Sequence, residues 1–569
     1  METARERLRH AIALREQLAR HYADVALPNH ISNGDDDRYA TQNYFASFTK
    51  GLPHLGPLGE VDPAAYHLLL HALRSGAPED FATVPEGCAD SSRQPFVDPQ
   101  AGLAFDLEGI DSHLLTMPPA YEFSSAGQIG EIAENYWLAL CRDVPFANYD
   151  APDPTVQAAA ADLSRYSVFD GPRDASGAVT VDTIFRAPFS GALLGPYLSQ
   201  FLLLDVPYGA ERFAQKVAYA LPGTQDYMTT VASWLTAQNG CNAGPAPTLV
   251  VPATNQKFMY RGRELAQYVH IDELFQAYLN ACLILISPPA RGGLGAPLNP
   301  GNPYPGSNQV GFGTLGEPNF KGMVAEVATR ALKAVWYQKW FVHRRLRPEV
   351  FAARIHHWMS NTLGSAKYPF HRGEFTKLGA PANPGAALAG SVLDRIFSHN
   401  QTVNGGQGTY LLPMAFPEGS PVHPSYGAGH ATVAGACVTV LKAIFDGDTP
   451  IQPLLQAASG PIALHWDVVI PDAVGMNLVT YGTNPQKQAQ AARMTVGGEL
   501  DKLAANIGIA RNFAGVHWRS DDIESLKLGE RVALEFLRET LTTYNEEVYC
   551  RLKLFDGSVV TITKTEIDR

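Results

Sequence analysis

Apolar residues recur at helical spacing through most of the second half of the chain. A repeat of three to four residues predicts helices with a buried face. The segments with this repeat are 264–286, 323–344, 431–445, 487–507 and 522–544. A sixth such helix is predicted over 127–144, whereas residues 25–125 and 143–210 are broken by Pro, Gly and Asp into loops over short helices. We therefore expect a mainly α protein whose core is a helical bundle.

The pattern changes at the C-terminal end of the chain. Residues 551–564 form two β-like runs on either side of Asp556-Gly557, a dipeptide typical of tight hairpin turns. We expect a single domain over 1–569, made of a loop-rich half (1–250), a helical half that carries the chemistry (251–550) and a small β-hairpin (551–564).

Composition narrows the possible partners. The chain has 569 residues, 46% of them hydrophobic, and a net charge of −12 with scattered Lys and Arg, so neither a nucleic-acid partner nor an anionic membrane is expected. No apolar run reaches the ~18–20 residues that span a membrane, and the N-terminus is charged and helix-like, so we expect a cytoplasmic protein. The six cysteines are widely spaced without a CxxC pair, and their pairing stays open.

The first candidate for chemistry is a turn flanked by histidines. In VHPSYGAGHATVAG, His423 and His430 stand on either side of a glycine-rich turn that leads into an apolar helix. Such a turn directs backbone N–H groups at one point and can hold an anion. The same segment also fits an ordinary helix start capped by a histidine, so an anion site needs cations from elsewhere.

The second candidate is KWFVHRRLRPE, residues 339–349. Arg347 precedes Pro348 and is therefore disfavoured in a helix, so we expect a helix to end near Arg347. That end would let Lys339 and Arg347 reach one ligand with their long side chains. Residues 343–345, His-Arg-Arg, are expected to form a solvated basic helix end.

The third candidate is RNFAGVHWRSDDIE, residues 511–524. Gly515 can end a helix between Arg511 and His517, and Ser520 or Asp521 can cap the next helix, so both side chains can turn inward. Asp521 is placed to accept a ring N–H from His517 and to fix its tautomer.

Together the three segments provide a complete set of groups for an oxyanion. Lys339, Arg347 and Arg511 are cations, the turn before His430 offers backbone donors, and both His430 and His517 can act as acid, base or ligand. The set suits a tetrahedral or trigonal-bipyramidal anion that carries about two to three negative charges.

The spacing of these residues resembles a known family. The patterns KxxxxxxxRP, HPSYxxGH and RxxxGxHxxxD, spread over residues 339–521, are similar to those of the vanadium-dependent haloperoxidases, especially the bromoperoxidases of algae and cyanobacteria. That family shares its pocket with PAP2-type acid phosphatases. The resemblance implies a core like two four-helix bundles.

The resemblance also implies a role for each matched residue. His517 would be the axial ligand of vanadium, and Lys339 and His430 would act on hydrogen peroxide. The groups that would hold the vanadate oxygens are Lys339, Arg347, Arg511 and the Gly429 N–H, beside His430. His423, counted with the catalytic residues, matches bromide-preferring members, whereas Trp336 resembles the chloride-oxidising members.

Two features depart from the family pattern. Ala428 stands where relatives commonly have Ser, so a hydroxyl donor near the anion is missing. The loop 288–316, where some relatives carry calcium, contains no Asp or Glu, which makes a calcium site there doubtful.

The expected function is the oxidation of bromide, or of chloride or iodide, by hydrogen peroxide to hypohalous acid. The hypohalous acid would halogenate a small organic nucleophile, and the enzyme would be a homo-oligomer, a dimer or larger. Two alternatives stay open: a PAP2-type acid phosphatase with His517 as nucleophile, and a non-catalytic oxyanion-binding protein.

Overall fold

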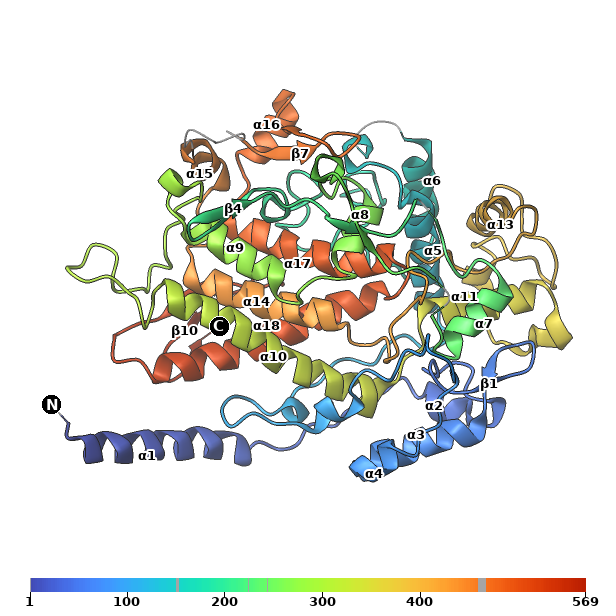
Figure 1. The fold of residues 1–569 in the computed structure, drawn as a ribbon, viewed down its shortest axis with the longest axis horizontal. Coiled ribbons are helices and arrows are strands. Elements are labelled where there is room, and N and C mark those ends of the chain that lie inside the picture. Colours follow the sequence, from blue (N-terminus) through green and yellow to red (C-terminus); the bar gives the residue numbers. More distant parts are fainter. Residues whose placement is uncertain (1, 150–152, 224, 243, 459–466, 569) are drawn as a thin grey trace.

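The structure, a computed structural model, describes residues 2–149, 153–223, 225–242, 244–458 and 467–568 (Figure 1). Its α-helices are α1 (Ala4–Ala23), α2 (Asp35–Arg38), α3 (Pro63–Ser75), α4 (Pro78–Phe81), α5 (Ala126–Cys141), α6 (Pro154–Leu163), α7 (Val231–Gln238), α8 (Gly262–Tyr268), α9 (Gln276–Ile286), α10 (Glu317–Tyr337), α11 (Pro348–Met359), α12 (Arg372–Phe375), α13 (Val392–Val403), α14 (Gly429–Ile444), α15 (Ile451–Ala457), α16 (Pro485–Ala491), α17 (Val496–Phe513) and α18 (Arg519–Thr542). The mainly α fold is confirmed.

The strands are short and all pair antiparallel. They are β1 (His54–Leu55) with β2 (Glu60–Val61), β3 (Val206–Tyr208) with β4 (Glu211–Phe213), β5 (Tyr219–Ala220) with β6 (Thr248–Leu249), β7 (Val469–Pro471) with β8 (Leu478–Thr480), and β9 (Cys550–Lys553), β10 (Val559–Ile562) and β11 (Ile567–Asp568). The predicted C-terminal hairpin is β9–β10, and β11 adds a third strand to it.

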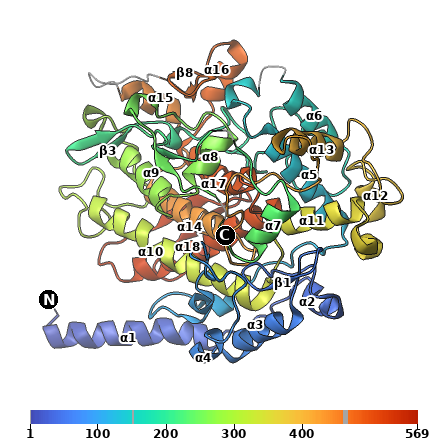
Figure 2. The ribbon, with the colours of Figure 1, turned by 45° about the vertical axis from the view of Figure 1, so that its right-hand side comes forward.

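The core is built around α14, which lies between α10, α17 and α18 in the middle of the molecule (Figures 1 and 2). Almost every residue of α14 is buried, because apolar and small side chains occupy all of its faces. α17 is buried along nearly its whole length as well. Solvent therefore hardly reaches either α14 or α17.

Two of the predicted helices were wrong, because each is divided in the structure. The segment 264–286 is not one helix, because α8 and α9 are separated by residues 269–275. The segment 487–507 is likewise divided between α16 and α17. α10 continues into a π-helical turn, Gln338–His343, which ends at Arg344 with φ at 40°. The helix thus ends before Arg347, and Pro348 begins α11, where its missing N–H costs nothing.

The loop-rich half contributes to the core as well as to the surface. α5 is buried on nearly all sides, and its Gln128 and Glu131 accept hydrogen bonds from Arg345 at 2.8 and 2.5 Å. The prediction that residues 343–345 form a solvated helix end was therefore wrong for His343 and Arg345, which are both buried. Burial of Arg345 is possible because carboxylates from both halves of the chain surround it.

The N-terminal helix contrasts with this interior. None of the residues of α1 is buried, and in Figure 1 the helix extends beyond the body of the molecule. Among the described residues, no helix combines the length and the apolar character needed to cross a membrane.

α14 and α18 approach so closely that their contact requires glycine. A Cβ added at Gly529 would overlap the Thr432 carbonyl oxygen, and one added at Gly435 would overlap that of Leu526.

We predict that Gly529→Ala pushes the two helices apart and lowers the free energy of unfolding by about 1–3 kcal/mol or more. Gly322→Ala, on the exposed face of α10 with nothing within 4 Å of its Cβ, should instead stabilise by up to ~1 kcal/mol. Thermal unfolding of the two variants beside the parent chain tests this, and equal melting temperatures would contradict it.

Candidate active site

Lys339 lies in the π-helical turn after α10 and is fully buried. Its Nζ donates to the carbonyl oxygens of Pro424 and Ser425, at 2.9 and 3.2 Å. Burial, reinforced by the neighbouring Arg347 and Arg511 guanidinium groups, holds the pKa of Lys339 well below its usual range. The turn from the second candidate segment therefore lies directly against the backbone that follows His423.

Arg347 joins two of the candidate histidines. It precedes α11 in an extended conformation, and its NH1 donates to His517 Nε2 at 3.1 Å while its NH2 donates to His423 Nδ1 at 2.9 Å. The carbonyl oxygens of His423 and Val516 accept its remaining bonds. Burial lowers the pKa of Arg347 to about 9. All three candidate segments therefore meet at this guanidinium.

His517 is held as a neutral ring whose unprotonated Nε2 accepts a hydrogen bond from Arg347. α17 ends at Phe513, and Gly515, with φ at 86°, turns the chain so that His517 points inward. Its Nδ1 bonds Asp521 Oδ2 at 2.9 Å, as predicted, so its Nε2 is the acceptor of the Arg347 bond. Burial, and after it the nearby cations, keep the pKa of His517 well below its usual range. An imidazole in this state can act as a metal ligand.

Asp521 holds several parts of the pocket at once. Its carboxylate also accepts from Arg345 NH1 at 2.8 Å, from the Ser425 hydroxyl and from the Trp518 N–H at 3.1 Å. The expectation that Ser520 or Asp521 caps α18 was wrong, since Trp518 is the N-cap and Asp521 closes on it from the third helical position.

His430, which is half-buried, is oriented by a residue that the sequence did not reveal. Its Nε2 lies 3.1 Å from Asp272 Oδ1, and Asp272 lies between α8 and α9, where the sequence predicted an unbroken helix. Burial lowers the pKa of His430, while Asp272 opposes that shift. Burial of Asp272 raises the pKa of its carboxyl, but His430 and Arg511 outweigh this and keep that pKa below its usual range. The only signal in the sequence was the acidic pair Asp272-Glu273 within an otherwise apolar run.

Arg511, from the end of α17, completes the set of cations. Its NH1 donates to the Val269 carbonyl oxygen at 2.7 Å, its guanidinium lies 5.9 Å from the ring centre of Phe416, and its Nε is buried with no hydrogen-bond partner. Burial lowers its pKa, and Asp272 is the strongest group opposing that shift. A buried donor without an acceptor indicates that an acceptor belongs in the pocket.

The three cations fit an anion of high charge. Within the described residues, Lys339, Arg347 and Arg511 donate to carbonyl oxygens and imidazole nitrogens, and no carboxylate lies within ion-pairing distance of them. Buried cations normally have an acidic partner. Together with the His517 lone pair and the buried Arg511 Nε, this set matches an oxyanion bound on one side by an imidazole.

The remaining candidates lie around the same pocket. The Trp336 ring centre is 5.1 Å from that of His423 and 5.5 Å from Lys339 Nζ. A Cβ added at Gly429, the first residue of α14, would lie 3.0 Å from the Trp336 ring. Ala428 is buried, and its N–H donates to Ser525 Oγ at 2.7 Å. The side chain of Ala428 itself supplies no polar group.

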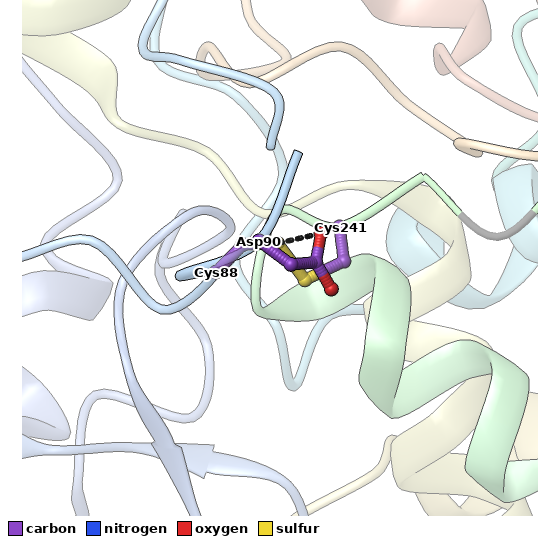
Figure 3. A group of neighbouring side chains, drawn as sticks. All are labelled: Cys88, Asp90 and Cys241. Carbon is purple, nitrogen blue, oxygen red and sulfur yellow. Dashed lines mark hydrogen bonds between the residues drawn. A yellow bond between two sulfur atoms is a disulfide. The ribbon is translucent and has the colours of Figure 1, made fainter. Parts of the chain in front are cut away.

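A cluster elsewhere in the chain does not form a metal site. Cys88, Asp90 and Cys241 bring one ligand atom each within 4.8 Å of one another, the sole such group in the described part of the chain. The two sulfurs are joined in a disulfide, with Cys88 Sγ 3.5 Å from Asp90 Oδ1 (Figure 3). Neither cysteine can therefore supply a thiolate. The sequence had left this pairing open.

The pocket of this mainly helical chain fits an oxyanion, and the comparisons identify the family. Residues 395–546 match the model of the VCPO second helical-bundle domain. The chain is 34% identical to a vanadium-dependent bromoperoxidase of Corallina pilulifera and 32% identical to one of Ascophyllum nodosum, covering 93% of this chain in both cases and 93% and 87% of those proteins. The homohexameric structure of the second vanadate-dependent bromoperoxidase of Ascophyllum nodosum is similar with a TM-score of 0.84 and 28% identity, over 99% of this chain and 91% of that one. The chain belongs to the vanadium-dependent bromoperoxidase family.

Anion binding should be coupled to proton uptake. Burial, and after it the neighbouring Arg347 and Arg511, depress the pKa of Lys339 in the free protein. A bound dianion should raise that pKa and draw in protons, so affinity should rise as pH falls. Sulfate is a suitable probe, since its charge is constant near neutral pH. We predict net proton uptake when sulfate titrations at pH 8 are compared in buffers of different ionisation enthalpy. Lys339→Met should reduce the uptake, whereas Lys527→Met, which removes an exposed partner of Glu524, should not. Equal heats in both buffers would contradict the coupling.

Proposed function

We propose that this chain uses vanadate to oxidise bromide with hydrogen peroxide, giving hypobromous acid that halogenates small organic nucleophiles. The observation that carries the proposal is the Arg347 guanidinium, which links the lone pair of His517 to His423. It does so inside a pocket of three cations that pair with no carboxylate among the residues that the structure describes. The family membership supports the same activity.

We assign the binding groups from the donors that converge. Lys339, Arg347, Arg511 and the Gly429 N–H would hold the oxygens of vanadate, and His517 Nε2 would be its nitrogen ligand. Bound vanadate supplies an electrophilic centre that activates hydrogen peroxide toward attack by a halide. Asp521 keeps the proton of His517 on Nδ1 and so leaves Nε2 unprotonated, as a nitrogen ligand must be.

The reaction takes up one proton, because bromide, hydrogen peroxide and a proton give hypobromous acid and water. His430 is the group best placed to handle this proton. Asp272 holds its Nε2 and stabilises the ring whenever it is charged, so His430 can alternate between acid and base while its orientation stays fixed. Lys339, Arg347 and His423 place positive or neutral groups, and no negative group, in the pocket, which favours the entry of an anion.

Bromide is the proposed halide, since His423 is in the pocket and the named relatives are bromoperoxidases. Trp336 beside it is the residue that resembles chloride-oxidising members. The related Ascophyllum nodosum protein is described as a homohexamer, and we propose that this chain also forms a homo-oligomer.

Reconstitution tests the proposed activity. Protein freed of vanadate should be inactive and should gain peroxide-dependent bromination of a phenol as orthovanadate is added. His517→Ala should abolish the gain, because it removes the nitrogen ligand. Phosphate should compete with vanadate, since the two anions share charge and shape.

Hydrolysis of p-nitrophenyl phosphate serves as the control for the phosphatase alternative. In a phosphatase vanadate would inhibit an existing activity, whereas here it should switch on bromination. Bromination that does not require vanadate, or a vanadate-inhibited phosphatase, would contradict the proposal.

Ala428 offers a test of anion affinity. Restoring the hydroxyl that relatives commonly have there, with Ala428→Ser, should add a donor beside the Gly429 N–H. Vanadate should then bind about fivefold more tightly or better, the equivalent of ~1 kcal/mol. Ala428→Gly adds no donor and should not tighten binding. Equilibrium titrations with vanadate measure both, and an unchanged or weaker affinity of the Ser variant would contradict the assignment.

A further inference from the structure

A surface segment runs from the disulfide to the candidate active site. Residues 86–98, called the strap here, contain Cys88, which is bonded to Cys241 across 153 residues of sequence. Beside the disulfide, Gln94 N–H donates to the Gly240 carbonyl at 2.7 Å and Asn242 N–H to that of Ser92 at 2.9 Å. The strap is therefore attached by a covalent bond and by backbone hydrogen bonds at one end.

The other end of the strap is attached to the pocket itself. Val97 N–H donates to the carbonyl oxygen of Val422, the residue before His423, at 3.0 Å. The Val97 carbonyl oxygen accepts the indole N–H of Trp336 at 3.1 Å. One residue of the strap thus holds both the backbone beside His423 and the ring that lies against it.

Trp336 forms the outer wall of the pocket. Its ring lies close to His423, Lys339 and Gly429, at the separations given above, and it is the one tryptophan in the described part of the chain that is not buried. Lys339 is fully buried, whereas the Trp336 ring next to it is half-buried. A shift of this ring would therefore change the surroundings of both Lys339 and His423.

Besides these attachments, the Gly87 N–H donates to the Gly51 carbonyl at 2.8 Å and the Phe96 ring packs edge-on against Trp340, with ring centres 6.0 Å apart. Most of its residues are exposed or half-buried, and Val97 itself is 39% exposed. Segments with few buried contacts open locally at small cost in free energy, so a covalent anchor matters most in such places.

We propose that the Cys88–Cys241 disulfide is a positioning element for halide binding: it anchors the strap so that the Val97 carbonyl fixes Trp336 over His423 and Lys339. Cys88, Cys241 and Val97 do not touch the reacting atoms and act through the indole. The expected effect on bromide kinetics rests on the proposed bromide oxidation. The expected effect on the position of the Trp336 ring concerns the vanadate-free protein and does not depend on that activity.

The double variant Cys88→Ser/Cys241→Ser tests this in the full chain. We expect the KM for bromide to rise several-fold while kcat and the affinity for vanadate stay close to those of the parent. Reduction of the parent with a phosphine should have the same effect, and the double variant should not respond to the phosphine. If the double variant fails to fold, the reduced parent still provides the comparison.

A second readout needs neither vanadate nor activity. Iodide quenching of tryptophan fluorescence in the vanadate-free protein should increase when the disulfide is absent, because the indole becomes more accessible. Trp336→Phe should remove that increase. This result would hold even if the protein did not oxidise bromide, so the two proposals can fail separately.

The control for a purely structural role is Gly529→Ala, which should lower the melting temperature without a selective change in the KM for bromide. Unchanged bromide KM and unchanged quenching after loss of the disulfide would overturn the proposal. The proposal would also be overturned if kcat and the affinity for vanadate fell together with the rise in bromide KM, all in proportion to the loss of stability.

Discussion

The pocket depends on the close packing of three cations, none of which has a carboxylate within ion-pairing distance in the described part of the chain. Two like charges about 4 Å apart repel by roughly 4 kcal/mol at an effective dielectric of about 20, and burial adds a desolvation cost. The protein offsets part of this cost with backbone carbonyl oxygens around Lys339, Arg347 and Arg511, and burial still lowers the pKa of all three. An anion of two or three charges relieves this repulsion, so the same arrangement that strains the free protein provides the binding energy.

This strained pocket is supported from both halves of the chain. Asp521 bonds His517, Ser425 and Arg345, and Arg345 in turn bonds Glu131 on α5. The network therefore connects the ligand histidine, the turn before α14 and the loop-rich half. Since each member is buried, loss of one partner would leave another charge unpaired, which is costly. The orientation of His517 is thus fixed by the packing of the whole molecule and not by its own turn alone.

The sequence was informative where chemistry depends on local spacing. A proline after Arg347, a glycine between Arg511 and His517, and two glycines before His430 each reveal a chain reversal, and three reversals that carry cations and imidazoles predict one oxyanion site. The helical core followed from hydrophobic periodicity. Both signals are local, so the errors in individual helix boundaries did not change the predicted fold or the predicted site.

The groups that support the site from a distance could not be predicted in this way. Asp272 was hidden because the apolar period continues across the break between α8 and α9. Arg345 looked like a solvated charge at a helix end, since its partners Glu131 and Asp521 are far away in sequence. The Cys88–Cys241 pair is separated by 153 residues, and spacing alone does not select it among six cysteines. Each of these contacts is set by tertiary packing.

The most direct test of this site is the position of vanadium in crystals of the protein soaked with orthovanadate, located by its anomalous scattering. One peak is expected within bonding distance of His517 Nε2, with Lys339, Arg347 and Arg511 around it. A peak away from these residues, or none at saturating vanadate, would contradict it.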